Sequence, residues 1–143
     1  YLVFIKFISK DKDIIGCYVK LIEEVIKKNK NQAKIKPLAE KLEEYLNITV
    51  NFTNWIKEKM KNSKDDVSAA CNDYLKVLGL IALGHSWLKV LDVSYKELSK
   101  NKKFFEDKIQ TANFFFNRVL PRIDSHYKSA ISGSGYIMNF KFN

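Results

Sequence analysis

Residues that break helices are scarce in this chain. Its 143 residues include only 5 glycines and 2 prolines. An all-β sandwich of this length would need turn residues about every 8–12 positions, so the scarcity excludes that class. The 46% of hydrophobic residues also excludes a disordered chain. Together, length and composition predict one domain made of long helices around a substantial core.

Cysteine and arginine are also rare. Cys17 and Cys71 lie within apolar helical patterns, so we expect buried free thiols in a reducing, cytoplasmic compartment. Only Arg118 and Arg122 accompany the lysines that produce a net charge of +9. Nucleic-acid recognition favours arginine, and the lysines are scattered along the chain. We therefore expect solvated lysine faces and no nucleic-acid partner.

Hydrophobic periodicity predicts four helices, over residues 13–30, 37–61, 64–99 and 105–131. The first carries an apolar stripe at 4-3-4 spacing that is widened by further isoleucines; its residues are Ile14, Tyr18, Leu21 and Val25, with Ile15, Ile22 and Ile26. Short connections imply that neighbouring helices run antiparallel. Pro121 falls inside the last pattern, where it removes a helical hydrogen bond and should bend the helix. The predicted fold class is all-α: an up-and-down four-helix bundle with a Pro-kinked last helix.

The same pattern divides the chain into three parts. Residues 1–12 are expected to continue from a missing upstream domain. The bundle itself should occupy residues 13–131. Residues 132–143 follow the "SGSG" break and form a C-terminal tail, as a docking strand or a disordered end.

The third helix contains the apolar stretch "GLIALGHSWLKVLDV". Lys76 and Lys89 bracket only twelve of its residues, whereas a membrane span needs about 20, so we predict no span. A helix that is apolar on all sides belongs in the core of a bundle. Gly79 and Gly84 should then mark close approaches of neighbouring backbones, with Trp87 filling space nearby.

No pattern in the sequence indicates a catalytic, cofactor-binding or metal site. His85 and His126 lack the Glu-x-x-His spacing of metal-binding bundles, and we expect His85 to be a core or edge residue. Cys71 and His85 are about 21 Å apart along one helix, which is too far for a thiolate–imidazole pair. The "SGSG" segment follows a helix and not a strand, so it is no phosphate loop.

The third and fourth helices nevertheless resemble a known domain. "YLKVLGLIALGHSWLKV" followed by "FFEDKIQTANFFFNRVLPRI" is similar to the C-terminal accessory domain of large acyl-CoA dehydrogenases. That group includes 3-methylmercaptopropionyl-CoA dehydrogenase-like enzymes, and the resemblance covers roughly residues 38–140. The residues that carry it are Tyr74, Leu75, Gly79, Gly84, Trp87, Phe105, Lys108, Phe114, Phe115, Phe116, Leu120 and Pro121.

The resemblance implies a parent flavoprotein of fatty acid metabolism that uses FAD to oxidise an acyl-CoA to the 2,3-enoyl-CoA. The general base, the flavin contacts and the thioester cleft of the family belong to the preceding domains. No FAD is therefore expected on this chain. The bundle is expected to be an assembly module whose partners are those domains and possibly a second subunit of a dimer.

Two other functions stay open. The bundle could be a stand-alone interaction protein that holds a partner helix in an apolar groove. Its positive charge also allows a basic module for nucleic acid or anionic membranes.

Overall fold

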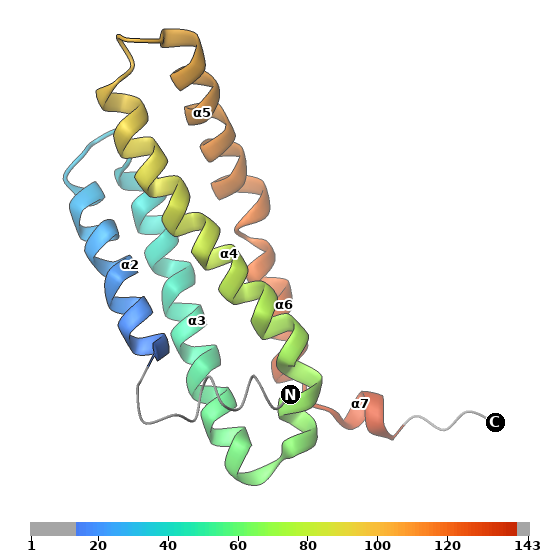
Figure 1. The fold of residues 1–143 in the computed structure, drawn as a ribbon. Coiled ribbons are helices and arrows are strands. Elements are labelled where there is room, and N and C mark those ends of the chain that lie inside the picture. Colours follow the sequence, from blue (N-terminus) through green and yellow to red (C-terminus); the bar gives the residue numbers. More distant parts are fainter. Residues whose placement is uncertain (1–13, 140–143) are drawn as a thin grey trace.

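Residues 14–139 are described by a computed structural model. Their helices are α2 (Ile14–Lys30), α3 (Lys36–Asn62), α4 (Lys64–Lys96), α5 (Lys102–Phe114), the π-helix η1 (Phe115–Val119), α6 (Arg122–Ile131) and α7 (Gly135–Met138). No strand occurs within these residues. α2, α3, α4 and the continuous α5–η1–α6 run alternately up and down and lie side by side (Figure 1). The predicted all-α, up-and-down four-helix bundle is confirmed.

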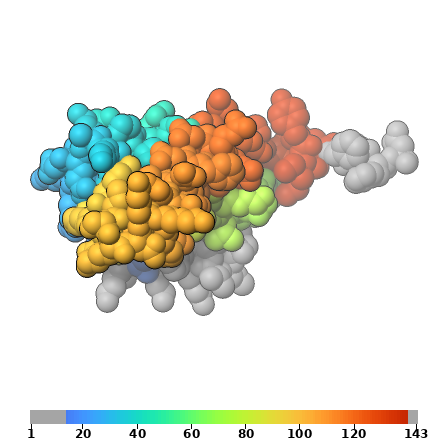
Figure 2. Space-filling view, turned by 90° about the horizontal axis from the view of Figure 1, so that it is seen from above, coloured from blue at the N-terminus to red at the C-terminus, as the bar shows by residue number. Residues whose placement is uncertain are grey.

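The two ends of the chain need separate mention. The expected upstream segment, residues 1–12, and the last four residues of the tail lie outside the described residues. Within the tail, residues Gly135–Met138 form the short helix α7, which is neither the strand nor the disordered end that the sequence allowed. α7 projects from the end of the bundle in both Figure 1 and Figure 2.

Local sequence sets the helix ends. Ser63 has an extended backbone, and its hydroxyl accepts a hydrogen bond from the Asp66 N–H at 3.3 Å, which begins α4 as expected. Asp66 also places negative charge at the positive end of the helix dipole. Asn101 caps α5 in the same way, through the Phe104 N–H at 3.3 Å. This cap starts the last helix at Lys102, three residues before the predicted start.

The last helix bends at Pro121, as predicted. Its ring leaves the helix without an N–H donor at that position. Just before it, the Leu120 N–H donates to the Phe115 carbonyl at 2.9 Å, the longer spacing of a π-helix. Beyond it, the N–H groups of Ile123 and Asp124 bond the carbonyls of Leu120 and Pro121 at 3.1 Å. The π-helical turn was not visible in the hydrophobic pattern.

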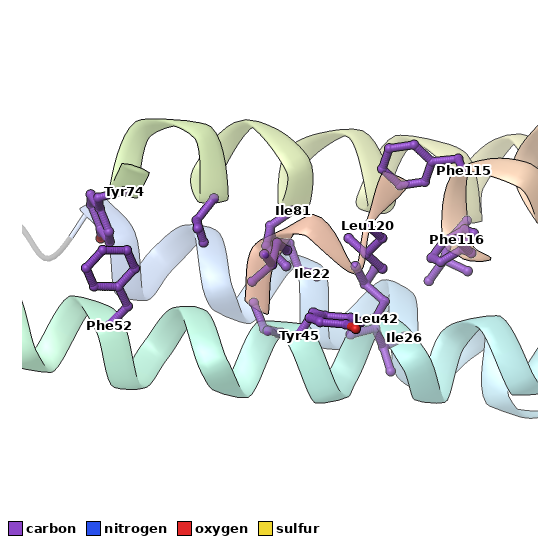
Figure 3. Close-up of a cluster of buried hydrophobic side chains, with 14 of the residues drawn as sticks. Ile22, Ile26, Leu42, Tyr45, Phe52, Tyr74, Ile81, Phe115, Phe116 and Leu120 are labelled. Atoms are coloured by element: carbon purple, nitrogen blue, oxygen red, sulfur yellow. The ribbon is translucent and has the colours of Figure 1, made fainter. Parts of the chain in front are cut away.

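The core lies between the helices, and α4 contacts each of the other long ones. Figure 3 shows side chains from α2, α3, α4 and the last helix meeting there. The ring of Phe52 meets that of Tyr74 edge to face, with centroids 5.0 Å apart. The Tyr74 hydroxyl lies 2.7 Å from that of Thr53, which itself donates to the Thr49 carbonyl. The bundle thus satisfies its buried tyrosine hydroxyl.

The apolar stripe predicted for the first helix is wider than the face that the bundle buries. Ile14 and Leu21 are 39% and 54% exposed, while Ile15 and Ile22 are buried. Cys17 lies on the same outer side as Ile14 and Leu21 and is exposed, so the expectation of a buried thiol is wrong there. Cys71 on α4 is half-buried. α2 carries apolar residues over a wider arc than its neighbours cover, so spacing alone allowed two overlapping stripes.

Candidate functional site

The long apolar helix α4 has a buried side and an open side. Tyr74, Ile81 and Leu88 are at most 1% exposed, whereas Leu75 and Leu83 are 66% and 52% exposed. The predicted core helix is confirmed on its buried side, where α4 contacts each of the other long helices, but Leu75 and Leu83 show that its apolar surface extends beyond that side. The four-helix arrangement covers only part of its circumference, and an apolar strip stays uncovered.

The two glycines of α4 belong to opposite sides. Gly84 is buried, and a β-carbon there would lie 2.6 Å from Cδ1 of Leu42 and 3.7 Å from Leu120 and Phe115. Gly79 is exposed, and a β-carbon there would meet no atom within 4 Å. The expected close approach of a neighbour is confirmed at Gly84 and wrong at Gly79.

Gly79 lines an open groove of about 890 Å³ between α4 and α6. Leu83 and small side chains on both helices form much of its wall: Ala82 and Ser86 on α4 and Ser125 on α6. Without bulk at these positions, the two helices leave a trough along their junction. We call this hollow, with its lining residues on α4 and α6, the α4–α6 groove.

Positive charge borders the α4–α6 groove. Lys76 and Arg122 line it, and neither forms an ion pair with a described residue. Among the residues that the structure describes, no Asp or Glu lines it. A smaller hollow between α2 and α3 differs, because Lys30 and Glu43 in its wall form an ion pair. The smaller hollow thus contains an internal ion pair, whereas the positive charges of the α4–α6 groove have no carboxylate partner among the described residues.

His126 also lines the groove, and Asp73 on α4 fixes the orientation of its imidazole. Its Nδ1 lies 2.8 Å from Oδ1 of Asp73. An aspartate and the imidazole that it orients are two of the three members of a nucleophile-activating triad. The third member is not assembled, because the Ser86 hydroxyl donates to the Ala82 carbonyl at 3.0 Å and no hydroxyl of the described residues bonds the imidazole. The pair links α4 to α6 and fixes one wall of the groove.

Other buried or half-buried carboxylates also join helices. Asp92 accepts from Lys28 at 2.9 Å, Gln32 at 2.7 Å and Lys96 at 2.8 Å, which ties α2 and its following turn to α4. The hydrogen bonds from the two lysines hold the pKa of Asp92 well below its usual range, against the opposing effect of burial. Sequence reasoning missed this cluster because Lys28 and Gln32 lie 64 and 60 positions from Asp92 in the chain.

Asp66 has a similar role at the other end of the bundle. It accepts from Lys59 on α3 at 2.8 Å and from the backbone and hydroxyl of Ser134 at 2.8 Å each. The bonds from Lys59 and Ser134 lower the pKa of this carboxyl well below its ordinary value. Gly133, at φ +83°, supplies the reversal after α6 that brings Ser134 back to Asp66.

His85 is an edge residue, as expected. It is half-buried and meets the ring of Tyr18 edge to face at 6.1 Å. Burial, and then the charge of Lys89, lower the pKa of His85. Within the described residues, no three His, Cys, Asp or Glu side chains gather as a metal site would require. The absence of a metal site stays a prediction for the chain as a whole.

Comparison with known proteins gives one decisive result. The family model described as "Acetyl-CoA dehydrogenase C-terminal like" matches residues 18–141. The chain belongs to this family. No curated protein and no solved structure matches it. The match begins within α2 and covers the rest of the bundle, including the helices for which the sequence supplied pattern and no motif.

Membership of the acyl-CoA dehydrogenase C-terminal family implies attachment to preceding domains. The residues that carried the resemblance fall on both sides of the bundle. Those buried in the core are Tyr74, Gly84, Phe115, Phe116 and Leu120, and those half-buried are Trp87, Phe105, Lys108 and Pro121. Leu75 and Gly79 are exposed, beside or within the α4–α6 groove. Their role as a family signature stays a prediction.

The α4–α6 groove does not have the features that hold FAD. Flavin dinucleotides are held by free backbone N–H groups at a helix start or glycine-rich loop. The groove is lined by residues within α4 and α6, and the N–H groups of Ile123 and Asp124 at the start of α6 are already bonded. No chemistry of a flavin is assigned to this chain.

One described helix, α4, is long and apolar enough to cross a membrane by length and composition alone. Its most apolar window has a mean hydropathy of 1.3, and 39% of it is buried inside the bundle. The core helix of a bundle passes the same test. The expected absence of a membrane span stays a prediction.

Proposed function

We propose that this bundle is a non-catalytic assembly domain of an FAD-dependent acyl-CoA dehydrogenase. In this proposal the preceding domains bind FAD and oxidise an acyl-CoA to the 2,3-enoyl-CoA. The bundle stabilises those domains and sets how subunits of the enzyme, a cytoplasmic dimer, come together. The family match supports its place at the C-terminal end of such a chain.

The observation that supports the assembly role is that the titratable side chains with clear partners join helices within the bundle, whereas the open groove is lined largely by apolar side chains. The carboxylates with depressed pKa values, Asp66 and Asp92, are used to tie helices of the bundle together. His126 is used in the same way, through Asp73. The open groove between α4 and α6 is instead lined largely by apolar and small side chains, and contiguous exposed apolar surface is typical of protein–protein interaction sites.

Removal of the bundle from the parent enzyme tests this role. We expect the enzyme truncated before the bundle to retain FAD but to unfold at a lower temperature and to change its subunit mass in light scattering. Truncation that leaves both the unfolding temperature and the mass unchanged would overturn the assembly role.

The isolated 143-residue chain provides the complementary test. After incubation with FAD and gel filtration, we expect its visible spectrum to lack flavin absorption. A chain that leaves the column with a stoichiometric flavin would place the cofactor site within the bundle and contradict the proposal.

A further inference from the structure

Gly79 has no explanation within the bundle. A glycine inside a helix costs about 1 kcal/mol relative to alanine. At Gly84 this cost is offset by the close packing of Leu42, which leaves no room for a β-carbon. At Gly79 a β-carbon would meet open space, on the wall of the α4–α6 groove. A glycine that the chain's own packing does not need is explained if another backbone lies against it.

The shape of the groove agrees with a helix as the object that lies there. Its walls are two adjacent helices, and the small side chains of Gly79, Ala82 and Ser86 follow one side of α4 at helical spacing. Leu75 and Leu83 flank them with exposed apolar surface. An amphipathic helix laid in such a groove buries its own apolar ridge against these residues.

Charge specifies that helix further. Lys76 and Arg122 border the groove and have no carboxylate partner among residues 14–139, and the carboxylate of Asp73 is already bonded to His126. Arg122 is one of only two arginines among 25 basic residues, and a guanidinium pairs with carboxylates through two parallel hydrogen bonds. The groove is thus complementary to a helix with Asp or Glu along its flanks.

We propose that the α4–α6 groove binds an amphipathic helix of the preceding dehydrogenase domains. That helix places small or apolar residues on Gly79 and Leu83 and carboxylates beside Lys76 and Arg122. This inference rests on the proposed assembly role and names the surface and the partner through which the bundle performs it.

Photocrosslinking in the full-length enzyme tests the assignment. p-Benzoylphenylalanine is placed at Leu83 and, as a matched control, at Leu21 on α2; these leucines are 52% and 54% exposed. We expect the Leu83 probe to crosslink to one helical segment of the dehydrogenase domains that carries Asp or Glu beside its apolar ridge. The Leu21 probe should give no such product.

Charge reversal tests the complementarity. Introducing Lys76→Glu and Arg122→Glu together should lower the yield of the Leu83 crosslink about tenfold, because two favourable charge pairs become repulsive. The control pair Lys20→Glu and Lys103→Glu, on α2 and α5, should leave the yield unchanged. Circular dichroism of each variant checks that the bundle is still folded. An unchanged yield in the folded Lys76/Arg122 variant would overturn the acidic partner.

Other occupants of the groove would give different products. A Leu83 crosslink to a second bundle would assign the groove to a bundle–bundle contact and overturn the proposal. Binding of the isolated chain to phosphatidylglycerol vesicles that is lost on Lys76/Arg122 reversal would assign it to a lipid surface, with the same consequence.

Failure of this inference can be told from failure of the assembly role. If truncation of the bundle disrupts the enzyme but crosslinks start only from Leu21, the bundle docks through another face. If truncation changes nothing, the assembly role itself fails.

Discussion

The two sides of α4 are built from similar residues, but one side packs in the core of the bundle and the other is exposed. On the inner side, Gly84 lies under Leu42 in a space that admits no further atom, and Tyr74 and Leu88 are fully buried. On the outer side, Gly79 faces open space and Leu83 is half exposed. The inner side is explained by the bundle alone. The outer side is explained by the proposed partner, and in that proposal one helix forms both the centre of the core and the edge of an interface.

The largest effect should separate two neighbouring phenylalanines. Phe116 is fully buried and Phe114 is 61% exposed. Phe116→Ala should lower the free energy of unfolding of the isolated chain by about 3–5 kcal/mol because it leaves a cavity in the core. Phe114→Ala should change it by less than about 0.5 kcal/mol. Urea unfolding of both variants measures the contrast, and equal losses would show that the last helix is rotated from the described orientation.

The next largest effect should be a difference in stability between substitutions at Gly84 and at Gly79. Gly84→Val should destabilise the isolated chain by about 1–3 kcal/mol more than Gly79→Val, because added atoms are forced against Leu42, Leu120 and Phe115. Both changes introduce the same residue into the same helix, so helix propensity cancels in the comparison. Thermal unfolding of the pair provides the measurement. Similar unfolding temperatures would mean that Gly84 is not a close contact.

A smaller, pH-dependent effect should come from Asp92. Its bonds to Lys28 and Lys96 hold its pKa in the folded chain below the ordinary value of about 4. The stabilisation is therefore present above pH 4 or so and is lost as the pH falls further and the carboxylate is protonated. Because both lysines are mostly exposed, Asp92→Asn should cost about 1 kcal/mol at neutral pH.

The test compares unfolding of wild type and Asp92→Asn at neutral pH and near pH 2. The difference between them should shrink in acid. A difference that stays constant would show that the charge of Asp92 contributes nothing.

The smallest change in stability, but the most informative for the outer side, should come from Gly79→Ala. In the isolated chain it should stabilise the bundle by about 0.5–1 kcal/mol, since alanine favours the helix and meets no neighbour. In the full-length enzyme the added methyl should instead weaken docking and lower the yield of the Leu83 crosslink. A gain in stability in both contexts would remove the argument that Gly79 accommodates a partner.

Features that depend on neighbouring residues were predictable from the sequence. The serine cap at Ser63 and the bend at Pro121 follow from the chemistry of one residue and its immediate surroundings. The alternation of four apolar helices with short connections fixed the bundle. The π-helical turn at Phe115 was not predictable, because it results from strain relieved just before the proline and leaves the hydrophobic spacing nearly unchanged.

Features that depend on which side of a helix packs against a neighbouring helix were harder to predict from the sequence. Leu21 and Ile22 are equally apolar, and only packing decides that Ile22 is buried. The hydrogen bonds from Gln32 to Asp92 and from Ser134 to Asp66 join residues 60 and 68 positions apart, which no local pattern reveals. The outer side of α4 was assigned to the core because a sequence does not distinguish apolar residues that face the bundle from those that face a partner.

The central claim is that the outer side of α4 is covered by the rest of the enzyme. Hydroxyl-radical footprinting compares side-chain labelling in the isolated chain and in the full-length enzyme, with Leu21 as an internal reference of similar exposure. We predict that Leu75 and Leu83 are labelled in the isolated chain and protected in the enzyme, while Leu21 reacts equally in both. Equal labelling of Leu75 and Leu83 in the two forms would contradict the account.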